Sequence, residues 1–154
     1  MAPFTHTCTV RWSDCDANGH AANTTYSEYA TDTRVAFLAS RGWTFQHFVD
    51  SRFGPVITRE EIDYLRELRM GDEVTVDFTL LGTSRDLARF RFAHAFTRAR
   101  DGKACAQIVV TGGWMDLSLR RLATPPEALA SIFRDFERGP GWVELPDAGN
   151  SRKG

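Results

Sequence analysis

The chain begins with a strict alternation of apolar and polar side chains. Phe4, His6, Cys8, Val10 and Trp12 fall on one face of an extended segment, and the threonines and the arginine between them fall on the other. A period of two residues in a stretch rich in β-forming side chains predicts a half-buried strand over residues 4–12. A polar segment rich in turn-forming residues follows it, up to position 23.

The spacing of the apolar side chains then changes from two residues to three and four. The positions that share this helical stripe are Tyr26, Tyr29, Ala30, Thr33, Ala36, Phe37 and Ser40. This spacing predicts a helix over residues 24–41. Thr25 and Glu28 can form a capping box at its start, and Gly42 stands where a left-handed residue would end it.

Four further strand-like segments follow in quick succession. They cover residues 56–64, 73–81, 87–98 and 103–117, and turn-forming residues such as Asp101-Gly102 separate them. Residues 43–53, which precede these strands, are aromatic and irregular and predict no regular element. Thr124-Pro125-Pro126-Glu127 is typical of a second helix start, and Gly139-Pro140 ends that helix. We expect residues 139–154 to form a flexible tail.

The order of these elements is a strand, a long helix, four strands and a short helix. Strands that follow one another through turns pair mainly antiparallel, so we expect an α+β fold with a sheet of about five strands. Because one long helix must cover one face of the sheet, layer packing predicts a sheet wrapped around a central helix. We expect residues 1–138 to form a single domain. The sheet edges and the other sheet face still need cover, which predicts a dimer.

Composition narrows the range of partners. The chain has 154 residues, a net charge of −1 and three cysteines without a CxxC spacing. This charge balance predicts no nucleic-acid partner and no anionic lipid surface, and the cysteine spacing favours neither a disulfide framework nor a zinc site. No segment stays apolar for the roughly 18 residues that a membrane span needs, and the N-terminus lacks the features of a signal peptide. We therefore expect a cytoplasmic protein.

The candidate chemistry lies in the polar segment that leads into the long helix. The N-terminus of a helix presents unpaired backbone N–H groups and about half a positive charge, so an oxyanion that develops beside it is stabilised. Asp14 and Asp16 come shortly before this point, and Asn18-Gly19 allows the tight turn that would bring a carboxylate back towards it. A carboxylate and an oxyanion hole form a minimal kit for acyl transfer. The spacing alone leaves turn formation and capping as the other interpretation.

The same segment resembles the signature of the hotdog-fold thioesterases, in the branch of 4-hydroxybenzoyl-CoA and bacterial acyl-CoA thioesterases. The matching residues are Val10, Arg11, Trp12, Asp14, Asp16, Gly19, His20, Asn23, Tyr26 and, within the helix, Arg34. Softer matches are Ile62-Asp63-Tyr64-Leu65, Gly71-Asp72-Glu73-Val74, Trp114, Asp116 and Arg120-Arg121. Ala22 departs from the family pattern, in which an asparagine is usual at this position. The resemblance covers about residues 5–137 in order and implies a hotdog fold.

The resemblance also implies the reaction and its principal groups. Asp16 takes the place of the family's catalytic carboxylate, as a nucleophile or as a general base for water. The backbone N–H of Asn23 takes the place of the group that polarises the thioester carbonyl. The implied substrate is an acyl-CoA, or an acyl carrier protein thioester, hydrolysed without a metal or redox cofactor. Family members form homodimers, or tetramers of two dimers, with active sites at the dimer interface.

Several other residues are candidates with a second interpretation beside the functional one. His20 orients water or the thioester, or it shapes the loop; Asp14 is expected to be structural, accepting backbone N–H bonds. Tyr26 lines the acyl pocket or is a core aromatic residue, and Tyr64 is a further candidate for substrate contact. Coenzyme A carries phosphates that need basic partners, for which Arg59 and Arg89 are plausible by position. His94 lies within an apolar alternating face and is expected to be a core histidine.

Two other functions remain open at this point. An enoyl-thioester hydratase or dehydratase could use the same fold, but it needs an acid–base pair suited to proton transfer at carbon, and only His20 lies near the right place. A non-catalytic acyl-CoA-binding regulator normally adds a DNA-binding segment, for which this chain has no spare domain and no basic patch. We predict no metal site, because three ligands within one loop without a distant fourth are a weak signal.

Overall fold

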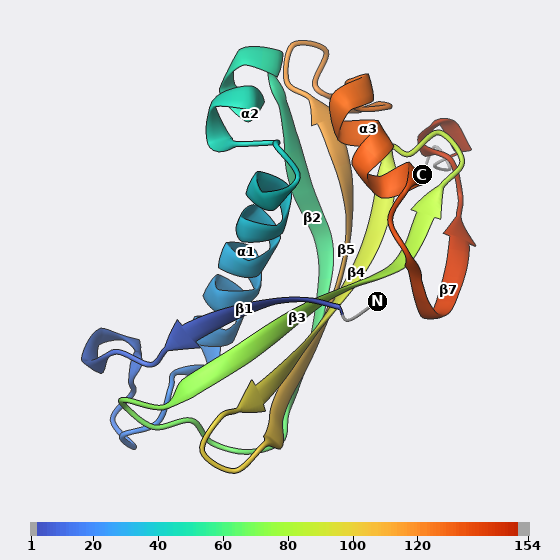
Figure 1. The fold of residues 1–154 in the computed structure, drawn as a ribbon. Helices are drawn as coiled ribbons and strands as arrows, with labels where there is room; N and C mark the ends of the chain where they lie inside the picture. Colours follow the sequence, from blue (N-terminus) through green and yellow to red (C-terminus); the bar gives the residue numbers. More distant parts are fainter. Residues whose placement is uncertain (1–2, 151–154) are drawn as a thin grey trace. The chain divides into compact units, whose positions relative to one another are not determined.

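The computed structural model describes residues 3–150 of the chain as a mixture of helices and paired strands (Figure 1). The helices are α1 (Asn23–Ser40), α2 (Phe45–Ser51) and α3 (Glu127–Arg134), with short 3-10 turns η1 (Trp12–Asp14) and η2 (Ala148–Asn150). The strands are β1 (Phe4–Thr9), β2 (Phe53–Tyr64), β3 (Glu73–Ser84), β4 (Arg89–Arg98), β5 (Lys103–Asp116), β6 (Arg121–Leu122) and β7 (Arg138–Leu145). The predicted α+β class is confirmed.

All of these strands belong to one hydrogen-bonded sheet in the described part of the chain. Its main path has the order β1-β3-β4-β5-β2, with β6 paired to β5 and β7 paired to β3. β1 runs antiparallel to the first half of β3, with Phe4 opposite Phe78 and Thr9 opposite Glu73 (Figure 1). The five strands of the main path are those that the alternation predicted, and β2 forms one end of it.

The chain divides into two compact units, and α1 and strands β2 to β5 contribute residues to both. The first unit consists of Met1–Phe37, Glu61–Phe78 and Ala93–Val109, and the second of Leu38–Glu60, Thr79–Phe92 and Val110–Gly154. Whether residues 1–138 act as one domain stays a prediction.

Aromatic side chains form the core of the first unit. Phe37 of α1 is fully buried and stacks on Phe78 of β3 with ring centroids 4.4 Å apart. His94 is also fully buried, with Nδ1 2.8 Å from the carbonyl oxygen of Asp77 and Nε2 3.1 Å from a guanidinium nitrogen of Arg34. Burial, together with the positive charge of Arg34, lowers the pKa of His94 to about 3. His94 is therefore the satisfied core histidine that the sequence predicted.

The second unit has an aromatic core of its own, to which α3 contributes. Phe133 of α3 packs against Phe92 and Trp114, with centroids 5.6 Å and 5.5 Å away. Gly112 permits the close approach of two strands here, because a Cβ at this position would lie 2.0 Å from the carbonyl oxygen of Val56. The core is therefore built from the inward faces of the predicted strands.

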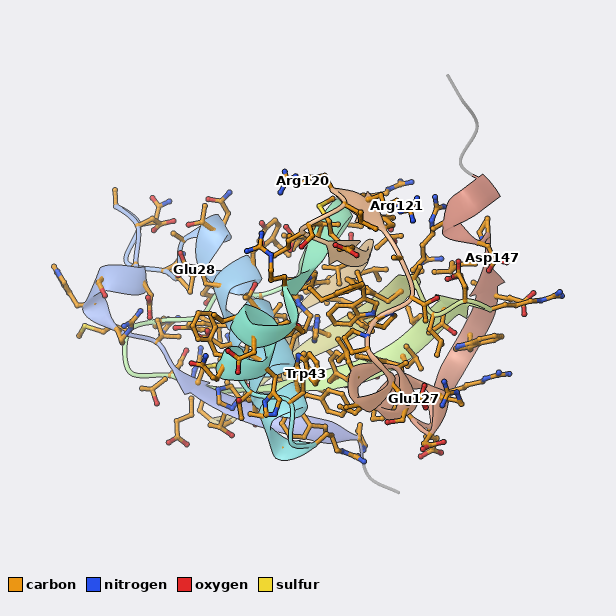
Figure 2. The ribbon with its side chains drawn as sticks, turned by 90° about the horizontal axis from the view of Figure 1, so that it is seen from above. Glu28, Trp43, Arg120, Arg121, Glu127 and Asp147 are labelled. Atoms are coloured by element: carbon orange, nitrogen blue, oxygen red, sulfur yellow. The ribbon has the colours of Figure 1, made fainter. Side chains whose placement is uncertain are left out.

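Three local predictions at the N-terminal end are wrong. β1 ends at Thr9, and Trp12 is 81% exposed because η1 turns the chain away from the alternating face. Helix α1 begins at Asn23, and Thr25 is no N-cap, since its hydroxyl donates to the carbonyl of Asp14 at 2.9 Å. Glu28 is exposed on α1 and closes no capping box (Figure 2).

The segment expected to be irregular contains helix α2. Thr44 and His47 form a capping box at its start, and the left-handed Arg52, with φ at 53°, ends it. Trp43, just before this helix, is buried and stacks on His47 with centroids 5.2 Å apart (Figure 2). These local contacts, together with the stacking of Phe48 on Trp114 at 6.3 Å, stabilise the short helix in place of an apolar periodicity.

The expectation of a flexible tail over residues 139–154 is wrong for its first half. Residues Arg138–Leu145 form β7, which pairs in parallel with β3 between Leu80 and Ser84. Gly139 packs directly on Thr79, where a Cβ would clash with the threonine methyl group. Positions 151–154 of the expected tail lie outside the described residues. Among the described residues we find no helix with the length and apolarity required to cross a lipid bilayer.

Candidate active site

The loop between η1 and α1 is closed on itself by backbone hydrogen bonds. The Asp16 N–H donates to the carbonyl of His20 at 2.8 Å, and the Gly19 N–H donates to the carbonyl of Asp16 at 3.1 Å. Gly19 adopts a φ of 77°, a left-handed conformation that glycine reaches without strain. The Ala21 N–H donates to Leu68 at 2.8 Å, which ties the loop to the segment after β2.

The Asp16 carboxylate lies at the centre of this loop. Its Oδ1 accepts the backbone N–H groups of Asn18 at 2.9 Å and of His20 at 3.3 Å. Within residues 3–150, no hydrogen bond is seen to its second oxygen, and the side chain is exposed. The loop thus orients one carboxylate oxygen and leaves the other accessible to a ligand.

Helix α1 starts beside this carboxylate. As the first residue of the helix, Asn23 has a backbone N–H that no intrahelical acceptor can reach, and we see no other acceptor for it among residues 3–150. The Asn23 carbonyl accepts the hydroxyl of Tyr64 at 3.2 Å. An unpaired N–H at the positive end of a helix dipole is a donor for a developing oxyanion.

Asp14 differs from Asp16 in being almost fully buried. Its carboxylate accepts hydrogen bonds from the backbone and guanidinium of Arg11 at 2.9–3.1 Å and from the hydroxyl of Tyr29 at 2.7 Å. The hydrogen bonds from Arg11 hold the pKa of Asp14 down at about 2. Burial and the contact with Asp14 raise the pKa of Tyr29, so its hydroxyl stays protonated and donates. Asp14 therefore has the structural role that we expected.

A cavity of about 350 Å³ opens beside the loop, entirely within the first unit. Its walls are formed by Asp16, His20, Ala21, Asn23, Tyr26, Tyr64, Leu65, Arg66 and Glu67. The structure thus brings Asp16, His20, Asn23, Tyr26 and Tyr64 together, as the sequence predicted. Arg59 of β2 and Arg89 of β4 are not among the lining residues.

Two tyrosines form the aromatic part of the cavity wall. Tyr26 is 4% exposed and lies between Tyr64, with centroids 5.3 Å apart, and Phe96, with centroids 5.5 Å apart. Burial raises the pKa of Tyr26 to about 12, so its phenol is neutral near pH 7. Tyr26 is therefore a core aromatic residue that also lines the cavity, and its contact with an acyl group stays a prediction.

The segment directly after β2 contributes residues that sequence reasoning missed. The backbone N–H groups of Leu65 and Arg66 both donate to the carbonyl of Cys105, at 2.8 Å and 3.0 Å. The Arg66 guanidinium donates to the carbonyl of Ala104 at 2.9 Å. Leu65 belonged to a soft match with the family pattern but was not a site candidate, and the one sequence signal for Arg66 is that it comes shortly after Tyr64, which was already a candidate. Among the described residues, no group of three or more His, Cys, Asp or Glu side chains is placed to hold a metal ion.

Comparison with known proteins now defines the class of protein. A family model described as the thioesterase-like superfamily matches residues 10–133, and the chain belongs to this superfamily. This membership agrees with the thioester hydrolase that the sequence motif predicted. The family match covers both the loop with Asp16 and the segment with Arg66.

Solved structures with the same fold include proteins of known ligand. A 1,4-dihydroxy-2-naphthoyl-CoA thioesterase from Synechocystis is 19% identical, with a TM-score of 0.77 over 87% of this chain and 97% of its own. A Staphylococcus aureus protein solved in complex with CoA is 23% identical, with a TM-score of 0.79 over 99% of this chain and 95% of its own. A gentisyl-coenzyme A thioesterase is 19% identical, with a TM-score of 0.70 over 85% of this chain and 99% of its own. The predicted hotdog fold is confirmed.

Proposed function

We propose that this protein is an acyl-CoA thioesterase, which hydrolyses a coenzyme A thioester to the free acid and coenzyme A. The observation that carries the proposal is that Asp16 and Asn23 line one cavity. Within residues 3–150, one oxygen of the Asp16 carboxylate has no hydrogen bond, and the N–H of Asn23, the first residue of α1, has no acceptor. Superfamily membership and the CoA-related ligands of the structural neighbours support a CoA thioester as the substrate.

The proposed reaction places the thioester carbonyl oxygen at the Asn23 N–H. As a nucleophile or water oxygen adds to the carbonyl carbon, negative charge moves to that oxygen and the N–H stabilises it. The C–S bond then breaks, and the leaving thiolate of coenzyme A takes up a proton. The loss of one such donor costs about 2.7–4 kcal/mol of transition-state stabilisation in other enzymes, so the position of this N–H is decisive.

Asp16 can promote the addition by either of two routes. As a general base it takes a proton from water, and the resulting hydroxide adds to the carbonyl. As a nucleophile its carboxylate displaces the thiolate and forms a mixed anhydride, which water then hydrolyses. His20 lines the same cavity, which supports the proposal that it orients the water. In a single-turnover reaction in ¹⁸O-labelled water, label on Asp16 identifies an anhydride that water hydrolyses at the Asp16 carboxyl carbon. An unlabelled Asp16 fits either the general-base route or an anhydride hydrolysed at the acyl carbon, and trapping of the acyl-enzyme then separates these two.

The chemistry supplied by Asp16 and the helix N-terminus needs no metal or redox cofactor, and we propose none.

We also propose that the chain forms a homodimer through β2. This strand lies at one end of the main path of the sheet, and most of its residues are exposed. An edge strand of twelve residues presents unpaired backbone groups that a second copy can pair.

Substitution of Asp16 by asparagine tests the catalytic assignment. We expect Asp16→Asn to abolish release of free thiol from acyl-CoA substrates, because the amide is neither a base nor a nucleophile at neutral pH, while the melting temperature stays close to that of the parent protein. The control is Asp32→Asn, the same chemical change on the exposed surface of α1. Near-normal turnover by Asp16→Asn would overturn the assignment.

The substrate panel for this assay separates the competing functions. Aromatic, short-chain and long-chain acyl-CoAs are followed by thiol release, and crotonyl-CoA is followed for the addition of water. Thiol release supports the thioesterase. Hydration of crotonyl-CoA without thiol release would assign a hydratase, and binding without turnover would assign a regulator.

A further inference from the structure

Asp14 makes hydrogen bonds with residues on both sides of the active-site loop, Arg11 before it and Tyr29 after it. We propose that Asp14 is the positioning residue of this site, which fixes the N-terminus of α1 relative to the loop that carries Asp16. The inference rests on the proposed function, because it concerns the geometry of the same two catalytic groups. Asp14 does not line the cavity of Asp16 and Asn23, so it acts on the reaction only through the positions of these two residues.

The side chain of Asp14 joins the two elements on either side of the loop. Its carboxylate accepts the Arg11 N–H at 2.9 Å, the Arg11 Nε at 3.1 Å and an Arg11 terminal nitrogen at 2.9 Å, just after β1. It also accepts the hydroxyl of Tyr29 at 2.7 Å, from the second turn of α1. Because charge-assisted hydrogen bonds are stronger than neutral ones, this buried carboxylate holds the first turns of α1 to the end of β1.

The backbone of Asp14 acts on the helix start directly. Its carbonyl accepts the N–H of Ala22, just before α1, at 2.8 Å and the hydroxyl of Thr25, within the first turn of α1, at 2.9 Å. Asn23 lies between these two contacts, so its N–H direction is set by them. Asp16, two residues after Asp14, is closed onto His20 by its own backbone bonds. The positions of both catalytic groups therefore depend on Asp14.

Burial makes this arrangement rigid. Asp14 is 4% exposed and Tyr29 is 5% exposed, so each of these polar groups has lost water and depends on its protein partners. The carboxylate has Arg11 and Tyr29, and the hydroxyl has Asp14 and, at 3.4 Å, the Thr9 carbonyl. A displacement of about 1 Å between reacting groups can reduce a rate by about a hundredfold. A loss of the Tyr29 contact should therefore lower kcat more than it changes the binding of the substrate.

The test compares two buried hydrogen bonds of the same helix. Tyr29→Phe removes the donor to Asp14, and the control Thr33→Val removes a hydroxyl that donates to the Tyr29 carbonyl at 2.8 Å inside α1. Tyr29→Phe also removes a 3.4 Å contact with the Thr9 carbonyl and a partner of a charged carboxylate, so it should be destabilised more than Thr33→Val. Both variants are therefore assayed at a temperature at which each is fully folded. We expect Tyr29→Phe to lower kcat for an acyl-CoA about tenfold with KM within twofold of the parent value. Thr33→Val should leave both constants within twofold.

Arg11→Gln gives a second test, at a side chain that is 70% exposed. Because it leaves the buried Asp14 carboxylate with fewer partners, it should lower stability, and kcat is measured at a temperature at which the variant is fully folded. It removes the two guanidinium contacts with Asp14 and should reproduce the selective loss of kcat. Faster amide exchange at Ala22 in Tyr29→Phe, but not in Thr33→Val, should accompany that loss. Equal kcat values for Tyr29→Phe and Thr33→Val, or a parent-like kcat in both Tyr29→Phe and Arg11→Gln, would overturn the inference. If instead the parent protein releases no thiol from any acyl-CoA, the proposed function fails, and if Asp16→Asn retains activity, the assignment of Asp16 fails; both results are separate from this one.

Discussion

Arg66 offers a direct way to learn how the cavity recognises its substrate. The other charged side chains of the cavity wall are already engaged: Asp16 accepts two backbone N–H groups, and Glu67 forms an ion pair with Arg69 at 3.3 Å. Arg66 uses one guanidinium N–H for the carbonyl of Ala104, and no ion pair with it is seen within residues 3–150. Its remaining donors suit a phosphate of coenzyme A, which a guanidinium binds in a bidentate manner.

The expected change in KM on substitution of Arg66 depends on the exposure of its side chain. Ion pairs between exposed side chains and their partners contribute about 0.2–1 kcal/mol. Arg66 is exposed, and about 1.4 kcal/mol corresponds to tenfold in a binding constant. We therefore expect Arg66→Ala to raise KM for an acyl-CoA by up to about fivefold with kcat unchanged. The increase should shrink at high salt, because exposed charges are screened.

The assay compares two substrates with the same acyl group. One is the acyl-CoA and the other is the N-acetylcysteamine thioester, which carries no phosphate. Arg66→Ala should raise KM for the first and leave the second unchanged. The control is Arg100→Ala, which removes an arginine of the same unit that pairs with Asp72 at 3.0 Å and does not line the cavity. An equal effect of Arg66→Ala on both substrates, or on neither, would refute the reasoning.

Two further predictions concern stability and assembly. The pKa of folded His94 is about 3, against 6.5 in the unfolded chain, so the unfolded state binds more protons between these values and stability falls as the pH drops from 6.5 towards 3. The loss in the free energy of unfolding is on the order of 4 kcal/mol, and urea unfolding between pH 7 and pH 4 measures it. If the free energy of unfolding of His94→Gln fell as steeply with decreasing pH as that of the parent, His94 would not be the cause. In sedimentation experiments, the protein should have about twice its chain mass of 17.3 kDa, and a monomer at assay concentrations would exclude the proposed pairing through β2.

Much of the fold could be predicted because alternation and helical spacing are local signals. Phe78, Phe90 and Phe96 occupy alternate positions whose burial the pattern implies, and all three are buried. β7 escaped prediction because Gly139, Pro140 and Gly141 are typical of a loop. Only the parallel pairing with β3 makes this segment a strand. Helix α2 escaped for a similar reason, since it depends on the contacts of Trp43 and on the left-handed Arg52.

The candidate site was predictable where it is contiguous in sequence. Asp16, His20, Asn23 and Tyr26 lie within eleven consecutive positions, and the structure places all four on one cavity. Arg66 was missed because its place depends on the hydrogen bonds of the segment after β2 with Cys105 and Ala104, which no local pattern encodes. Arg59 and Arg89 were chosen by strand position alone, and that criterion does not select cavity-lining residues.

In the proposed mechanism, the thioester carbonyl lies between the Asp16 carboxylate and the Asn23 N–H. A crystal structure of Asp16→Asn with a bound acyl-CoA tests it most directly. The thioester carbonyl oxygen should lie about 2.7–3.1 Å from the Asn23 nitrogen, with the side chain at position 16 facing the carbonyl carbon. A thioester bound with its carbonyl away from the first turn of α1, in a protein whose parent form hydrolyses the same compound, would contradict the account.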